Sequence, residues 1–198
     1  MSRVQIPARL WHNHGVSRRP SNTAPREPRV PKPIDAETLE RLALHYVGKY
    51  ATTRAKLGEY LRRKLRERGW AGEGSFDIPA LAERFSDLGY IDDRAFAEAR
   101  AEALGRRGYG IRRVSQALTV AGIDEADAAP VRAAAGARGW ESAVAYAKRK
   151  RIGPFALAPA DPAKRDKLLS AMIRAGHPFD HARRLVSAAP GEIPDVPD

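Results

Sequence analysis

Apolar positions along this chain recur with helical spacing, and the pattern ends three times at a glycine. In each case two apolar residues stand eight and four positions before the glycine, so both lie on one face of a helix that ends there. The three sets are Leu61, Leu65 and Gly69; Val114, Leu118 and Gly122; and Leu168, Met172 and Gly176. The glycines are 53 and 54 residues apart, which is room for about two or three short helices. The pattern therefore predicts three similar helical units.

The first predicted unit covers residues 36–90. Asp35 is the expected N-cap of its first helix, in which apolar residues from Leu39 to Tyr50 follow one helical face. A second helix is predicted over residues 53–68 and a third over 78–88.

The second predicted unit covers residues 91–138 and begins with two adjacent aspartates. Asp92 is the expected N-cap, and Asp93 lies at the positive end of the helix dipole, so we interpret both as structural capping residues. Phe96, Ala99, Ala103 and Leu104 are predicted to face inward. A Gly-Tyr-Gly turn at 108–110 precedes the next helix, and an alanine-rich third helix is predicted over 124–135.

The third predicted unit covers residues 139–189. A helix begins near Trp140, a proline-containing loop spans 152–162, and a second helix passes through Leu168 and Met172. The inward residues of its last helix are expected to be Phe179, Ala182, Leu185 and Val186. Because no segment shows the two-residue alternation of a strand, we predict an all-α fold of three tandem three-helix repeats.

Charge and cysteine content narrow the expected partners. Among 198 residues, 35 are Lys or Arg and 24 are Asp or Glu, which gives a net charge of +11. This balance favours nucleic acid or acidic protein surfaces as partners. The chain has no cysteine, so it offers no disulfide, thiolate metal site or cysteine nucleophile. It also lacks a long apolar run and a hydrophobic signal core, so we expect a cytoplasmic protein without a membrane partner.

The two ends differ in composition from the predicted units. Residues 1–35 hold six prolines and seven Arg or Lys, which predicts a disordered basic arm. Residues 190–198 are rich in proline and mildly acidic, which predicts a disordered acidic tail.

Three clusters of basic residues are the predicted binding sites for a partner or for DNA. The first lies on the second helix, the second surrounds the Gly-Tyr-Gly turn, where Tyr109 could stack on a base, and the third is a run of four. The members are Arg54, Lys56, Arg62, Arg63, Lys64 and Arg66; Arg106, Arg107, Tyr109, Arg112 and Arg113; and Lys148, Arg149, Lys150 and Arg151. A solvated face without a partner remains the alternative for each cluster.

We predict no catalytic residue, metal site or cofactor. His177 and His181 stand one helical turn apart but lack further ligands at metal-binding spacing. Asp92 and Asp93 are adjacent, so their side chains diverge at a helix start. No nucleophile, base and acid stand in a recognisable order.

One stretch of the second unit resembles the RecX family of regulatory proteins. The resemblance rests on the run Gly89-Tyr90-Ile91-Asp92-Asp93-Arg94-Ala95-Phe96-Ala97, then on Arg107-Gly108-Tyr109-Gly110-Ile111, and then on Leu118 with Gly122-Ile123. It extends over residues 36–189, and it departs from the family pattern at Ser115-Gln116-Ala117-Leu118 and at His177-Pro178.

The resemblance implies a non-enzymatic modulator of the RecA recombinase. Members are elongated, curved proteins that bind RecA filaments on single-stranded DNA, and some also contact DNA directly. From the resemblance we expect a monomer that restrains recombination, DNA repair and the DNA-damage response.

The sequence is also compatible with two other functions. Helical units with glycine turns and basic second helices are also similar to helix-turn-helix modules, which would make the chain a stand-alone nucleic-acid-binding protein. A helical enzyme that uses Asp92 or Asp93 is the more distant alternative. Salt-sensitive, site-preferring binding to naked DNA would favour the first, and action on recombinase ATP hydrolysis would favour the regulator.

Overall fold

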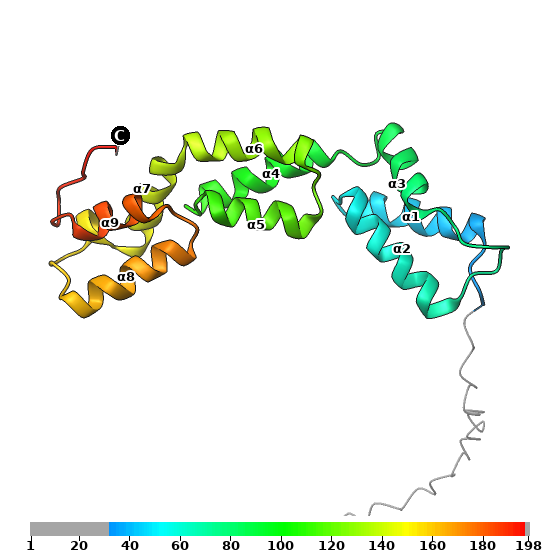
Figure 1. The fold of residues 1–198 in the computed structure, drawn as a ribbon, viewed down its shortest axis with the longest axis horizontal. Coiled ribbons are helices and arrows are strands. Elements are labelled where there is room, and N and C mark those ends of the chain that lie inside the picture. Colours follow the sequence, from blue (N-terminus) through cyan, green and yellow to red (C-terminus); the bar gives the residue numbers. More distant parts are fainter. Residues whose placement is uncertain (1–31, 197–198) are drawn as a thin grey trace, which may run out of the picture. The chain divides into compact units, whose positions relative to one another are not determined.

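The computed structural model describes residues 32–196, and the predictions for 1–31 and 197–198 lie outside this range. The described residues form nine α-helices, one short 3-10 helix and no strand (Figure 1). The elements are α1 (Ala36–Lys49), α2 (Arg54–Arg68), α3 (Ile78–Asp87), α4 (Asp93–Arg106), α5 (Ile111–Ala121), α6 (Glu125–Ala137), α7 (Gly139–Lys150), η1 (Gly153–Phe155), α8 (Pro162–Arg174) and α9 (Phe179–Ser187). The all-α prediction is confirmed.

The helices pack in three consecutive groups (Figure 1). Each group surrounds its own apolar core. The groups are α1–α3, α4–α6 and α7–α9. We call them repeats one, two and three. Each core is built from one face of each helix in its group, as the helical spacing of apolar residues predicts.

The core of repeat one contains Leu39, Leu57, Leu61 and Phe85, all buried. Ile34 is also fully buried there, and its backbone bonds to Gly69 and Ala71. Ile34 belongs to the segment that we predicted as a disordered arm, so the prediction extends too far at its C-terminal end. Leu65, predicted as core, is half-buried, because it lies in the last turn of α2.

The core of repeat two contains Val114 and Leu118, as predicted, but the buried face of α4 differs from the prediction. Ala97, Ala101 and Leu104 are buried, whereas Ala99 is exposed. Alanine is abundant on several faces of this helix and carries little apolar area, so its spacing does not fix the inward face.

Repeat three buries Met172, Ala182 and Leu185, as predicted. Leu168 is half-buried, and Phe179 at the start of α9 remains 51% exposed. Phe179 follows the N-cap Pro178, so it lies at the helix end rather than against the core.

The predicted helix ends are confirmed where polar side chains cap them. Asp35 accepts a hydrogen bond from the backbone of Thr38, and Asp92 accepts one from Ala95. The glycine that ends α5, Gly122, adopts the left-handed conformation with φ 68°. Gly69 and Gly176 also have positive φ, so all three recurring glycines occupy backbone conformations that favour glycine.

None of the helices in the described range is long and apolar enough to cross a membrane.

We predict that Leu61→Ala lowers the free energy of unfolding by about 2 to 5 kcal/mol, because it leaves a cavity in a closed core. Leu65→Ala is the matched comparison one turn away, and its cost should be clearly smaller because the side chain is half-buried. Urea unfolding followed by circular dichroism measures both. Equal losses would contradict the assigned inward face of α2.

Candidate functional site

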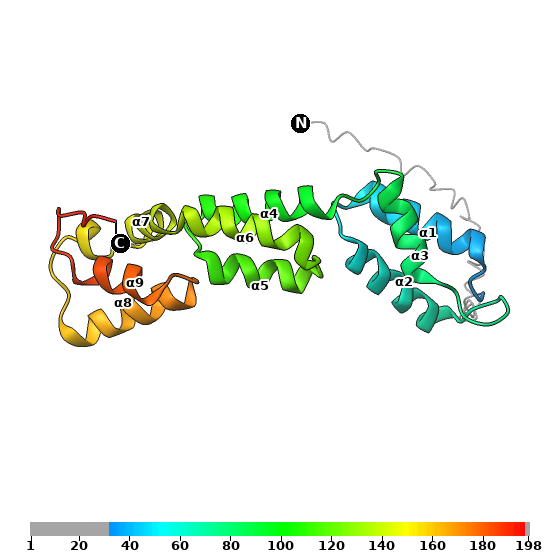
Figure 2. The ribbon, with the colours of Figure 1, turned by 45° about the horizontal axis from the view of Figure 1, so that its top comes forward.

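The second helices of successive repeats meet end to end. At the first joint, the hydroxyl of Thr53, the N-cap of α2, donates a hydrogen bond of 2.7 Å to the carbonyl of Ala121, the last residue of α5. At the second, the backbone N–H of Gly110, the N-cap of α5, donates one of 3.0 Å to the carbonyl of Ala175, the C-cap of α8. Figure 2 shows α2, α5 and α8 in this order. Each joint therefore brings together the positive end of one helix dipole and the negative end of the next.

Glycines permit the close approach at both joints. A Cβ on Gly122 would overlap that of Ala55, and a Cβ on Gly176 would lie 2.5 Å from the backbone nitrogen of Arg113. Gly108, in the predicted turn, similarly packs against the backbone of Tyr146. Gly108, Gly122 and Gly176 are thus contact points between repeats.

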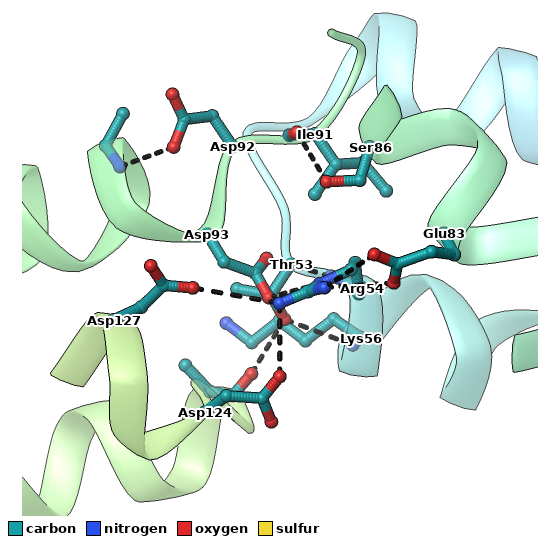
Figure 3. Close-up of polar contacts among 12 residues, drawn as sticks. Thr53, Arg54, Lys56, Glu83, Ser86, Ile91, Asp92, Asp93, Asp124 and Asp127 are labelled. Atoms are coloured by element: carbon teal, nitrogen blue, oxygen red, sulfur yellow. Dashed lines mark hydrogen bonds and ion pairs between the residues drawn. The ribbon is translucent and has the colours of Figure 1, made fainter. Parts of the chain in front are cut away.

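Arg54 connects repeats one and two at the first joint (Figure 3). Its guanidinium lies 2.9 Å from Glu83 of α3, 3.0 Å from Asp93 of α4, 3.1 Å from Asp124 and 3.7 Å from Asp127 of α6. Hydrogen bonds to Asp93 and Glu83 raise the pKa of Arg54 further above its ordinary value. Four carboxylates already surround this charge, so we no longer assign Arg54 to a DNA or partner interface.

Asp93 lies in the first turn of α4, as predicted, and also makes a contact that the sequence did not predict. Its carboxylate is buried and accepts two hydrogen bonds of 3.0 Å, one from the backbone N–H of Arg54 and one from its Nε. Asp93 therefore satisfies a free N–H at the start of α2, a helix of the neighbouring repeat. Asp92 alone caps its own helix, α4.

His177 is the buried polar residue at the second joint. Its ring is fully buried, and Nε2 lies 3.0 Å from the carbonyl oxygen of Gly108. A carbonyl oxygen can only accept, so Nε2 carries a proton. Burial lowers the pKa of His177 from 6.5 to about 4, although the hydrogen bond to Gly108 opposes this shift, so the ring is neutral at neutral pH. His177 therefore joins repeats two and three, which gives it a structural role.

Tyr109 is half-buried, and this corrects the predicted exposed stacking ring. It packs against the cores of both repeat two and repeat three. The guanidinium carbons of Arg107 and Arg149 lie 5.4 and 5.7 Å from its ring centre. The structure thus brings the second and third predicted basic clusters together around one aromatic ring.

The remaining predicted cations are distributed as follows. On α2, Arg63 and Lys64 both pair with Glu67, whereas Arg62 and Arg66 are exposed and pair with no carboxylate of residues 32–196. Arg106 lies 3.4 Å from Glu102. No ion pair within residues 32–196 involves Lys56, Arg107, Arg112 or Arg113. Lys148, Arg149, Lys150 and Arg151 are exposed at the end of α7.

Comparison with known proteins identifies the family. The family model described as RecX, second three-helix domain, matches residues 92–130, which include α4, α5 and the start of α6. The regulatory protein RecX of Myxococcus xanthus is 31% identical over an alignment of 181 residues, and the match covers 86% of this chain and 96% of that protein. This chain belongs to the RecX family. RecX of Agrobacterium fabrum is 25% identical, with 78% of this chain and 84% of that protein covered.

The fold agrees with that of a solved RecX. The crystal structure of RecX from Lactobacillus salivarius matches with a TM-score of 0.54 and 18% identity, over 76% of this chain and 93% of that one. RecX is a family of regulatory proteins rather than enzymes, as the sequence predicts.

The sequence does not reveal the contacts that join the repeats of this chain. Nothing in the spacing of Arg54 and Asp93, 39 positions apart, indicates that they meet. His177 looks like a surface residue beside a proline, yet it is buried. The usable signal was the repeat itself, because equivalent helices in stacked repeats must contact one another.

We predict that Arg54→Met lowers the free energy of unfolding by about 2 to 3 kcal/mol, because it leaves the buried carboxylate of Asp93 without its guanidinium partner. Adding Asp93→Asn to that variant should cost less than the two single changes together predict, and a double-mutant cycle by urea unfolding measures this coupling. Arg84→Met is the control, since it removes the exposed pair with Glu40 and should cost under about 1 kcal/mol. Additive losses would contradict the assigned pair.

We also predict a loss of stability in acid that depends on His177. Because its folded pKa of about 4 lies below the ordinary 6.5, the unfolded chain binds more protons between these values. The contribution of the neutral ring to the free energy of unfolding is therefore fully present above pH 6.5. It is lost as the pH falls toward 4, and the loss reaches about 3 kcal/mol. Thermal unfolding across this range should show a flatter profile for His177→Gln. His45→Gln, at an exposed position, should leave the profile unchanged, and a similar flattening there would contradict the assignment.

Proposed function

We propose that this chain regulates a RecA-type recombinase by binding its filament on single-stranded DNA and restraining recombination, DNA repair and the DNA-damage response. Family membership supports a regulatory role, since the relatives bear the name regulatory protein RecX. The net charge of +11 supports a polyanionic partner.

The row of arginines on α2 is the observation that carries the proposal. Arg62, Arg63 and Arg66 are exposed, and Glu67 is the carboxylate that lies near one of them, 3.8 Å from Arg63. An exposed pair at this distance contributes little, so the row keeps most of its charge for a partner. We call these three residues the α2 arginine row.

The contacts of Arg54 at the first joint hold α2 in place, and the α2 arginine row takes no part in them. Arg54 at the start of α2 is held by carboxylates of three other helices. The rest of the helix can therefore present its cations to a partner without using them to hold the fold. This division of roles supports a binding surface on a stably placed helix.

A titration of the full chain into recombinase filaments tests the proposal. The filaments are assembled on single-stranded DNA with ATP, and ATP hydrolysis and strand exchange are measured together. We expect both to fall at chain concentrations below that of the recombinase. Unchanged rates, with salt-sensitive and site-preferring binding to naked DNA, would instead favour a stand-alone nucleic-acid-binding protein.

We predict that reversing the α2 arginine row, with Arg62→Glu, Arg63→Glu and Arg66→Glu, weakens inhibition of strand exchange. If these residues contact DNA, each lost phosphate contact should lower the log-log salt slope of binding by about 0.7. Stability should change by less than about 0.5 kcal/mol, since the positions are exposed.

A control with the same change of charge uses Lys164→Glu, Arg165→Glu and Lys167→Glu on α8, where the three side chains are exposed. It should inhibit like the natural chain. Equal inhibition by both triple variants would mean that the α2 arginine row is solvated surface, and the partner would have to bind elsewhere.

A further inference from the structure

A basic groove lies between α4 and α5 of repeat two and reaches α2 of repeat one. Its cavity volume is about 410 Å³. Four cations line it, namely Lys56 of α2, Arg100 of α4, Arg107 at the C-cap of α4 and Arg113 of α5. We call it the α4–α5 groove.

The α4–α5 groove differs from the neighbouring cavities in its charge. No carboxylate lines it, although Gln116 and several apolar residues do. Four other cavities in the described part of the chain each include at least one aspartate or glutamate. Arg113 hydrogen-bonds to the neutral Gln116 at 2.8 Å, so its charge is not neutralised. The groove therefore has an excess of positive charge that an anionic ligand would relieve.

The spacing of the cations indicates a ligand with several anionic groups. Arg100 and Arg107 are seven residues apart, so they lie on one face of α4 about 10 Å apart along its axis. Arg113 lies on the opposite wall, at the start of α5. A single small anion cannot reach both ends, whereas a chain of phosphates can.

Aromatic and apolar side chains accompany the cations. The ammonium of Lys56 lies 4.9 Å from the centre of the Phe96 ring, and the guanidinium of Arg107 lies 5.4 Å from that of Tyr109. These contacts hold two of the cations in place, which reduces the entropy lost when a ligand binds. Val120, 77% exposed, adds apolar surface to the wall of α5.

We propose that the α4–α5 groove binds consecutive phosphates of a single nucleic-acid strand, with a sugar or base against its apolar wall. Alternating phosphates and bases, whose flat faces stack on apolar surface, match a site that combines cations with Phe96 and Val120. The inference deepens the proposed function and takes its biological setting from it, but binding of a naked strand needs no recombinase. It adds Arg100 and Phe96 to the binding residues and separates this site from the α2 arginine row.

Fluorescence anisotropy of a short labelled oligo(dT) with the full chain, without recombinase, tests the groove. The variant Arg100→Glu with Arg113→Glu should bind about tenfold or more weakly, and its log-log salt slope should be smaller by about 1.4, or 0.7 for each lost contact. The neutral pair Arg100→Gln with Arg113→Gln should weaken binding in the same direction. The matched control, Arg165→Glu with Lys167→Glu on α8, should bind within about twofold of the natural chain.

Circular dichroism should show that each variant keeps its helix content. Binding by both groove variants within about twofold of the natural chain would overturn the proposal. Competition by poly-glutamate as effective as by unlabelled oligo(dT) would also overturn it, because the groove would then take an acidic protein segment. Inorganic polyphosphate as an equal competitor would exclude a role for the bases and overturn the nucleic-acid assignment.

The two proposals can fail separately. If the natural chain binds oligo(dT) through the groove but does not slow the recombinase, the groove stands and the proposed function fails. If the chain slows the recombinase while the groove variants bind oligo(dT) normally, the function stands and the groove assignment fails.

Discussion

The packing of each repeat against the next depends on the end-to-end contact between their second helices. Thr53 and Gly110 occupy equivalent N-cap positions, and each donates to a carbonyl at the C-terminal end of the second helix of the following repeat. Each acceptor is a backbone carbonyl that a helix end leaves without an internal partner. The same bonds therefore finish the helices and connect the repeats, so a change at one of these ends affects both.

This constraint explains why a glycine recurs at nearly constant distance. A cap alone would accept asparagine at Gly122, but a Cβ there would also overlap Ala55 of the preceding repeat. At Gly176 a Cβ would press on the backbone of Arg113. Gly69, at the end of α2, has no neighbour within 4 Å of such a Cβ among the described residues. Contacts between repeats therefore require glycine at two of the three recurring positions, Gly122 and Gly176.

The sequence predicted the parts of the fold that depend on local patterns and missed those that depend on distant partners. Asp35 and Asp92 were predictable because an N-cap is decided by the next three residues. Leu61 and Met172 were predictable because leucine and methionine mark an apolar face strongly. The face of α4 was not, since alanine marks it weakly, and the misplacement of Ala99 followed.

The same distinction separates Arg54 from the cations that remain free. In the sequence Arg54 and Arg62 look alike, as exposed positions of one basic helix. In the structure Arg54 lies at a helix start where carboxylates of repeats one and two converge and pairs with them, whereas Arg62, two turns further on, forms no ion pair with a described carboxylate. A basic repeat protein needs a few cations to neutralise its joints, and main-chain hydrogen bonds complete those joints without further charge. The rest of the positive charge, on α2 and in the α4–α5 groove, can then serve an anionic partner without loss of fold stability.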